Sequence, residues 1–197
     1  MKTTNPFLLN KRIDITFVSF NLSDILRNTG FSLRDCQFHH DKDKDGKEVL
    51  ECDFDPWFLD KDGNKTYFQR GLVWNDDDKR SLIDSIYHGI NIGAFVIGRR
   101  SYEAGVRHGS FHDIIDGKQR LNAIIEFGQG KFADSYGNYW NDLDDLAQRT
   151  FWNYNKQTLA IVEDPSPELI KRIFLTVNYT GKPMSKEHIE FVKSINI

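Results

Sequence analysis

The chain has 197 residues, of which 39% are hydrophobic and 28% charged, a composition typical of a folded domain rather than a disordered segment. Its net charge of −3 excludes a generally basic nucleic-acid-binding protein, although a local basic patch is compatible with it. Cys36 and Cys52 form no CxxC pair, so we expect free thiols. The sequence has no apolar run of signal-peptide or membrane-spanning length, which predicts a cytoplasmic protein without a membrane partner.

The N-terminal third contains short elements separated by turn signals. Alternating apolar residues predict a strand over 12–20, and a short helix is expected over 22–28. Residues 46–69 are predicted to form a β-meander, because turn-forming residues interrupt them at 62–64. We therefore interpret residues 1–65 as an extension packed on a core of residues 66–197, most simply within one globular unit.

One segment of this extension has the spacing of half a calcium-binding loop. Asp41, Asp43, Asp45 and Gly46 fit the first half of an EF-hand loop. The twelfth position, which needs a bidentate glutamate, is Cys52, and no helix pair is predicted around the loop. A polar hairpin turn is the favoured interpretation.

A capped helix and a buried strand follow. Asn75 and the three aspartates after it are typical of a helix N-terminus. The apolar face of this helix would consist of Leu82, Ile83 and Ile86. Residues 94–97 read as a buried strand, and residues 98–110 as a polar, hairpin-like loop. This loop carries Arg99, Arg100, Arg107 and His108.

The most informative stretch is FHDIIDGKQRL at 111–121. Residues 111–115 are predicted to be a strand, and Asp116 is expected to cap the helix that follows. Gly117 lets another group approach closely because it has no Cβ. Lys118, Gln119 and Arg120 would then stand in the first helical turn, where anions are favoured. A phosphate site is therefore one interpretation, and an ordinary capped strand–helix junction with solvated cations is the other.

The C-terminal part is predicted to alternate between helices and strands. Ser185 is expected to cap the last helix. The other expected elements are a hairpin over 131–140, a helix over 141–149, a strand over 157–162, a helix over 165–177 and a turn over 178–183. Because no repeat or linker is present, we predict a single α+β domain.

Two groups of residues invite a metal-site hypothesis. His112 and Asp116 would share one face of a strand, with His108 and Asp113 near them in sequence, although a strand histidine is more often structural. Cys36, His39 and His40 lack the second half of a zinc site.

Three motifs follow one another in order: QR-x-x-VW at 69–74, DGKQR at 116–120 and IFLTVN-x-x-GKPMS at 173–185. This series resembles the ParB/sulfiredoxin-like domain that forms the N-terminal (GmrS) part of GmrSD-type modification-dependent restriction enzymes. The resemblance implies that fold, with a small mixed sheet and flanking helices. Lys118 replaces the first Gln of the family's DGQQR motif, and Met184 replaces a Leu. The chain ends at Ile197, before the helical region and HNH nuclease of the family's larger enzymes.

The resemblance also implies a nucleotide site with Mg²⁺ and an NTP. It assigns catalytic roles to Asp116, Gln119 and Arg120, with Asp116 also holding the metal. It assigns nucleotide contacts to Gln69, Arg70, Gly117, Lys118 and Asn178. On this basis Arg120→Ala is expected to weaken nucleotide binding by about 1.5–3 kcal/mol.

Each of these assignments has a structural alternative. Arg70 would stack on Trp74 or pair with an acid, Asp116 would be a helix cap only, and Asn178 would form a turn. Trp74 is expected to be a core residue rather than a base-stacking platform.

Three functions from different classes remain open. The first, which we favour, is an NTPase or NTP-gated domain acting in a DNA-related restriction or anti-restriction setting. The second is a Mg²⁺-dependent DNA nuclease. The third is a non-catalytic module that binds a restriction-type protein partner, a nucleotide or DNA.

Overall fold

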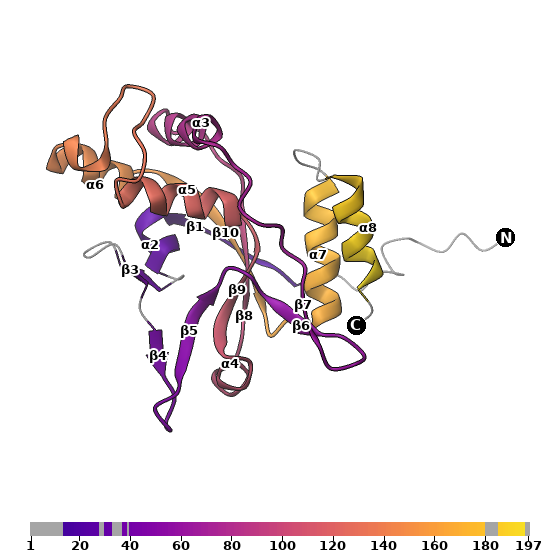
Figure 1. The fold of residues 1–197 in the computed structure, drawn as a ribbon. Helices are drawn as coiled ribbons and strands as arrows, with labels where there is room; N and C mark the ends of the chain where they lie inside the picture. The colour runs from indigo at the N-terminus through magenta and orange to yellow at the C-terminus, as the bar shows by residue number, and fades with distance from the viewer. Residues whose placement is uncertain (1–13, 28–29, 33–36, 39, 180–184, 196–197) are drawn as a thin grey trace.

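The structure is a computed structural model that describes residues 14–27, 30–32, 37–38, 40–179 and 185–195. Within these residues a six-stranded sheet has the order β1-β10-β8-β9-β5-β4 (Figure 1). Its strands are β1 (Thr16–Asn21), β4 (His40–Lys42), β5 (Glu48–Asp53), β8 (Phe95–Arg99), β9 (Ser110–Asp116) and β10 (Lys156–Glu163). Two small antiparallel pairs join β2 (Phe31–Ser32) with β3 (Gln37–Phe38) and β6 (Trp57–Leu59) with β7 (Lys65–Tyr67).

The sheet is mixed and carries helices on both faces. The pairs β10–β8 and β5–β9 are parallel, whereas β1–β10, β8–β9 and β4–β5 are antiparallel. The helices are α2 (Leu22–Arg27), α3 (Asp76–Tyr87), α4 (Tyr102–His108), α5 (Lys118–Gly128), α6 (Asp145–Asn153), α7 (Pro167–Tyr179) and α8 (Lys186–Ser194), with a 3₁₀ turn at Trp140–Asp142. No helix of the described residues is long and apolar enough to cross a membrane.

Two hydrophobic cores follow from this layering. Side chains from α2, α3, α5 and α6 pack together on one face of the sheet, with Phe127 and Phe151 at the centre of an aromatic cluster. Side chains from β6, α7 and α8 pack on the other face, around Phe68 and Phe174. Figure 1 shows α3 and α5 on one side and α7 with α8 on the other. The α+β prediction is confirmed, and the arrangement is consistent with a ParB-like fold.

The N-terminal 65 residues contribute directly to the main sheet. Strand β1 pairs with β10 at one edge, and β5 lies between β9 and β4 near the other. The turn between β4 and β5 is a polar hairpin turn, as predicted. Asp43 Oδ1 accepts hydrogen bonds from the backbone N–H groups of Asp45 (2.9 Å) and Lys47 (2.8 Å), and Gly46 has a φ of +80°.

Several predicted helices are confirmed with their caps. Asn75 and Asp78 form a reciprocal capping box at the start of α3. Ser185 accepts a hydrogen bond from the backbone N–H of His188 at the start of α8. The helix expected over 141–149 begins later, at Asp145, after Asp144 has capped it.

Two local predictions were wrong. Residues 98–110 are not a loop, because α4 occupies their centre and ends at Gly109, whose φ of +96° is typical of a helix C-terminus. Residues 131–140 form a turn without strands. Oδ1 of Asp134 accepts hydrogen bonds there from the backbone N–H groups of Tyr136 (2.9 Å) and Asn138 (2.8 Å). These N–H groups are therefore bonded to a side chain and not to a neighbouring strand.

Candidate functional site

A pocket of about 500 Å³ lies where the turn from β9 into α5 meets the segment 69–74 and the C-terminal half of α7. We call it the motif pocket. Its lining includes every site residue predicted from the sequence, namely Gln69, Arg70, Asp116, Gly117, Lys118, Gln119, Arg120 and Asn178. The remaining wall is largely apolar and includes Trp74, Leu82, Ile92, Phe174 and Val177. Residues far apart in the sequence therefore converge on one cavity.

Gly117 directly precedes helix α5, whose start has no side-chain cap. Gly117 has a φ of +103°, and a Cβ there would lie 2.5 Å from Cδ1 of Phe95. The prediction that Asp116 caps the helix is wrong. Its Oδ2 instead pairs with Nη2 of Arg120 at 2.6 Å, because a guanidinium one turn ahead is a stronger partner than a neutral N–H.

Arg120 connects α5 to the segment before β8. Its Nη1 donates to the carbonyl of Ile92 (2.8 Å), and its Nη2 donates to the carbonyl of Ala94 (3.0 Å). The guanidinium carbon lies 4.9 Å from the ring centroid of Phe95. Burial lowers the pKa of Arg120, and the charge of Asp116 opposes this shift. The side chain is therefore a nearly enclosed part of the scaffold.

Lys118 is also enclosed, although it was expected to face a phosphate. Its Nζ forms an ion pair with Asp55 and donates to the carbonyl of Arg70 at 3.2 Å. The residue as a whole is only 7% exposed. The charge that the sequence places in the motif is therefore neutralised by an acid from the segment between β5 and β6.

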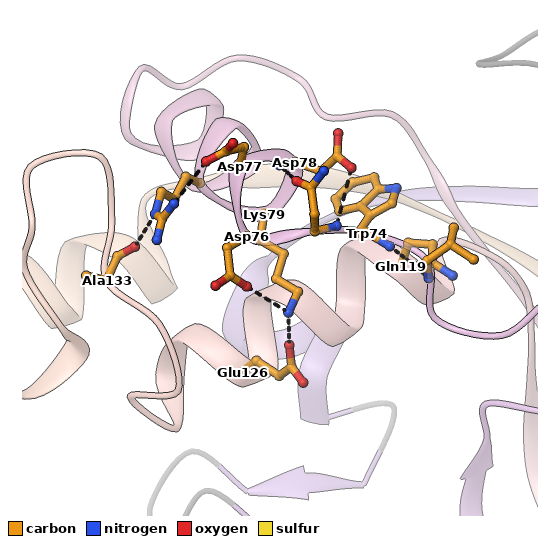
Figure 2. Close-up of polar contacts among 11 residues, drawn as sticks. Trp74, Asp76, Asp77, Asp78, Lys79, Gln119, Glu126 and Ala133 are labelled. Carbon is orange, nitrogen blue, oxygen red and sulfur yellow. Dashed lines mark hydrogen bonds and ion pairs between the residues drawn. The ribbon is translucent and has the colours of Figure 1, made fainter.

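Gln119 and Gln69 fasten the segment 69–74 to the motif. Oε1 of Gln119 accepts from the backbone N–H groups of Val73 (3.1 Å) and Trp74 (3.4 Å), and its Nε2 donates to the carbonyl of Gly71 (2.9 Å). Figure 2 shows Gln119 reaching the backbone at Trp74, just before α3. Nε2 of Gln69 donates to the carbonyls of Ile114 (2.8 Å) and Ile115 (3.0 Å) in β9.

The start of α3 is tied to α5 by charged side chains as well. Lys79 forms ion pairs with Asp76 (3.4 Å) in its own helix and with Glu126 (2.9 Å) in α5. Figure 2 shows these contacts below the first turn of α3. They hold α3, which contributes Leu82 to the pocket wall, in a fixed position relative to α5.

Arg70 differs from the other cations of the pocket. Within the described residues its guanidinium has no hydrogen bond, ion pair or ring contact, so the structural alternative of stacking on Trp74 or pairing with an acid is not observed. Trp74 is partly buried: it packs against the core next to α5 and also lines the motif pocket. Asn178 lies in α7 and not in a turn, and its Nδ2 donates to the carbonyl of Phe174 at 2.8 Å.

A second cluster is formed by Asp53, His108 and Asp113. Sequence reasoning named His108 and Asp113 in its metal-site hypothesis but missed Asp53. His108 lines another pocket, of about 410 Å³, which we call the α4 pocket. Burial lowers the pKa of His108, and burial likewise raises the pKa of Asp53. The pairing of β5 with β9, which brings Asp53 to Asp113, leaves no local signal in the sequence.

The pair of His112 and Asp116, which the sequence offered as a possible metal site, is not assembled. His112 Nδ1 lies 2.9 Å from the carbonyl oxygen of Glu51, whereas Asp116 pairs with Arg120. The side chains of Cys36, His39 and His40 lie outside the described part of the chain. Cys52 is a buried free thiol whose pKa is raised by burial.

One family matches the chain. It is described as the GmrSD restriction endonuclease, N-terminal domain, and it matches residues 61–194, which is more than half of the chain. The matched range contains all three motifs and every residue of the motif pocket. No curated protein and no solved structure matches the chain.

Proposed function

The chain belongs to the family of GmrSD restriction endonuclease N-terminal domains, and from this premise we propose that its motif pocket binds a nucleotide. A DNA-related restriction setting follows from the family. The observation that carries the proposal is the pairing of two features in one cavity. These are the Arg70 guanidinium, which has no partner among the described residues, and the start of α5, which no side chain caps.

Both features favour an anion. The first N–H groups of a helix have no partner within the helix and carry a partial positive charge, which attracts phosphate. The Lys118 and Arg120 charges are already offset by Asp55 and Asp116, so Arg70 supplies the net positive charge of the pocket lining. A phosphate group placed between Arg70 and the start of α5 would pair with the guanidinium and accept hydrogen bonds from the first N–H groups of the helix.

The rest of the cavity suits a nucleoside. Its volume of about 500 Å³ lies within the range of ordinary ligand pockets, roughly 300–1,000 Å³. Trp74, Leu82 and Ile92 provide an apolar wall against which a base would lie. This division into an anionic and an apolar end supports a nucleotide rather than a simple anion.

The pocket also fits the Mg²⁺ that such a nucleotide carries. Mg²⁺ is usually held by one or two carboxylates together with substrate phosphates. One oxygen of Asp116 is paired with Arg120, and its Oδ1 has no hydrogen bond to the described residues. Asp116 would therefore hold the ion, which would offset charge on the phosphate oxygens.

The engagement of Gln119 and Arg120 favours binding over rapid hydrolysis. Their side-chain groups hold the segments 71–74 and 92–94, so neither is placed to orient water or to stabilise charge in a transition state. We therefore propose an NTP-gated module. The partner that responds to the nucleotide would be DNA or a restriction-type protein.

Thermal unfolding with ATP, GTP, CTP and TTP, each with and without Mg²⁺, tests this proposal. A nucleotide at about 100 times its dissociation constant adds ~2.7 kcal/mol of stability, which gives a clear shift. The shift should fall to about half or less in Arg70→Ala, as a roughly 10- to 100-fold loss of affinity implies, and persist in full in Arg149→Ala, which removes an exposed guanidinium from α6. No shift with any nucleotide, or equal shifts in both variants, would refute the proposal.

A further inference from the structure

The cluster of Asp53, His108 and Asp113 at the α4 pocket has two carboxylates and one paired cation, Arg100. Asp53 and Asp113 are direct register partners on the neighbouring parallel strands β5 and β9, where like charges repel. The Asp113 side chain is 0% exposed, and Nη2 of Arg100 forms an ion pair with its Oδ2 at 2.5 Å. Within the described residues Asp53 has no ion pair, so two carboxylates share one cation.

A buried histidine nitrogen faces these carboxylates. Nε2 of His108 has no hydrogen-bond partner among the described residues and lies 4.0 Å from Oδ1 of Asp113. Stacking of its ring on Trp57, with 4.3 Å between centroids, fixes its direction. Buried ring nitrogens are normally hydrogen-bonded, and an unpaired one beside two carboxylates has the chemistry of a metal ligand.

Outer contacts orient both carboxylates, through both oxygens of Asp113 and one oxygen of Asp53. Arg100 engages Oδ2 of Asp113, whose Oδ1 is 3.3 Å from the hydroxyl oxygen of Ser110. Oδ1 of Asp53 accepts from the backbone N–H of Asp55 at 2.8 Å, which leaves its Oδ2 without a hydrogen bond to the described residues. Such supporting partners are typical around carboxylates that ligate a metal.

We propose that Asp53, His108 and Asp113 form a binding site for a divalent transition-metal ion of the Mn²⁺ type. One ligand atom from each residue lies within 4.8 Å of those of the other two. Ligands around such an ion are roughly 3–4 Å apart, so the cluster closes by about 1 Å on binding. One imidazole with two carboxylates suits Mn²⁺ better than Mg²⁺, which prefers oxygen ligands alone.

This site is separate from the Mg²⁺ expected at Asp116 in the motif pocket. Three protein ligands leave coordination positions open, as at metal sites that bind a further ligand. His108 also lines the α4 pocket, so those positions are accessible from that side.

Titration of Mn²⁺ into the full chain, followed by electron paramagnetic resonance of the free ion, tests the site. We expect one bound ion per chain without any nucleotide. Asp53→Asn and His108→Ala should each weaken binding at least tenfold. Mn²⁺ is the appropriate probe because cysteine side chains, which Cys36 and Cys52 provide, select Zn²⁺.

Control variants distinguish Mn²⁺ binding at this site from Mn²⁺ binding to other surface side chains. His88→Ala and Asp145→Asn remove a histidine and a carboxylate elsewhere and should leave Mn²⁺ affinity unchanged. Asp53→Asn keeps the shape of the side chain and removes one of two facing charges. Without metal, the melting temperature of this variant should therefore be no lower than that of the parent. Unaltered Mn²⁺ affinity in Asp53→Asn, or no binding at millimolar Mn²⁺, would overturn the proposal. If His108→Ala proves unstable without its Trp57 contact, Asp53→Asn decides the question.

Discussion

Two arginines line the motif pocket and have opposite surroundings. Arg120 has three hydrogen bonds to Ile92, Ala94 and Asp116, and its side chain is 15% exposed. Arg70 has no hydrogen bond or ion pair within the described residues. The sequence predicted both as site residues, and both line this pocket. It could not distinguish their roles, because the carbonyls that bind Arg120 belong to a segment 26–28 residues away.

This difference predicts that replacing Arg120 destabilises the protein far more than replacing Arg70. Arg120→Ala leaves Asp116 and two carbonyls without their partner, so it should lower the free energy of unfolding by about 3 kcal/mol. Arg70→Ala should change it by less than about 0.5 kcal/mol. Urea denaturation of both variants measures these values. Similar losses of stability in the two would contradict the assignment of Arg120 to the scaffold.

Lys118 is the residue that departs from the family motif, and its partner Asp55 lies outside the three motifs. The sequence suggested a phosphate ligand because a cation in a first helical turn is ambiguous on its own. A double-mutant cycle with Lys118→Gln and Asp55→Asn should give a coupling energy of about 1 kcal/mol. The side chain of Asp55 is 56% exposed, so solvent limits the value. Purely additive effects on unfolding would rule out the pair.

At the scale of elements, the start of α5 depends on Gly117. Gly117→Ala would force a left-handed backbone on alanine and place its Cβ against Phe95. Gly137 is a matched control, because its φ is +88° and nothing lies within 4 Å of a Cβ there. Gly137→Ala should cost about 1–2 kcal/mol and Gly117→Ala at least 1 kcal/mol more. Thermal unfolding of the two variants gives the comparison, and equal costs would argue against the close contact with Phe95.

Helices α3 and α4 show when local sequence is sufficient to predict a helix and when it is not. The boundaries of α3 were predictable because Asn75, Asp78 and the apolar face act within one helix. Helix α4 was missed because it has only seven residues and contains Gly105, a poor helix former. Gly105 is required there by tertiary packing, since a Cβ would lie 2.3 Å from Cδ1 of Phe111. That constraint comes from the next strand and is invisible in helical periodicity.

At the scale of the whole molecule, three strands of the N-terminal third, β1, β4 and β5, belong to the main sheet. Strand β5 pairs with β9, the strand that leads into the DGKQR turn, and Asp55 follows β5 directly. Composition and turn signals predicted short strands but not this pairing, because register between distant segments depends on the assembled sheet. Asp53 was missed as a member of the second cluster for the same reason.

The burial of Cys52 in β5 allows the stability of β5 within the main sheet to be measured. Cys52 is 8% exposed, and burial together with the charges of Asp113, Asp53 and Glu51 raises the pKa of its thiol. In a Cys36→Ser variant the remaining thiol should therefore be labelled by a thiol reagent only as fast as the protein unfolds. The labelling rate should rise with denaturant in parallel with global unfolding. Complete labelling within seconds in native buffer would show that β5 opens independently.

The central claim is that Arg70 and the uncapped start of α5 bind the phosphates of a nucleotide. Isothermal titration of Mg²⁺-NTP into the parent chain and into Arg70→Ala tests it most directly. We predict one nucleotide per chain for the parent and an affinity lower by about 10- to 100-fold in Arg70→Ala, which corresponds to about 1.4–2.7 kcal/mol, the scale of a lost charged hydrogen bond. A parent chain that binds no nucleotide, or a variant that binds as tightly as the parent, would contradict the account.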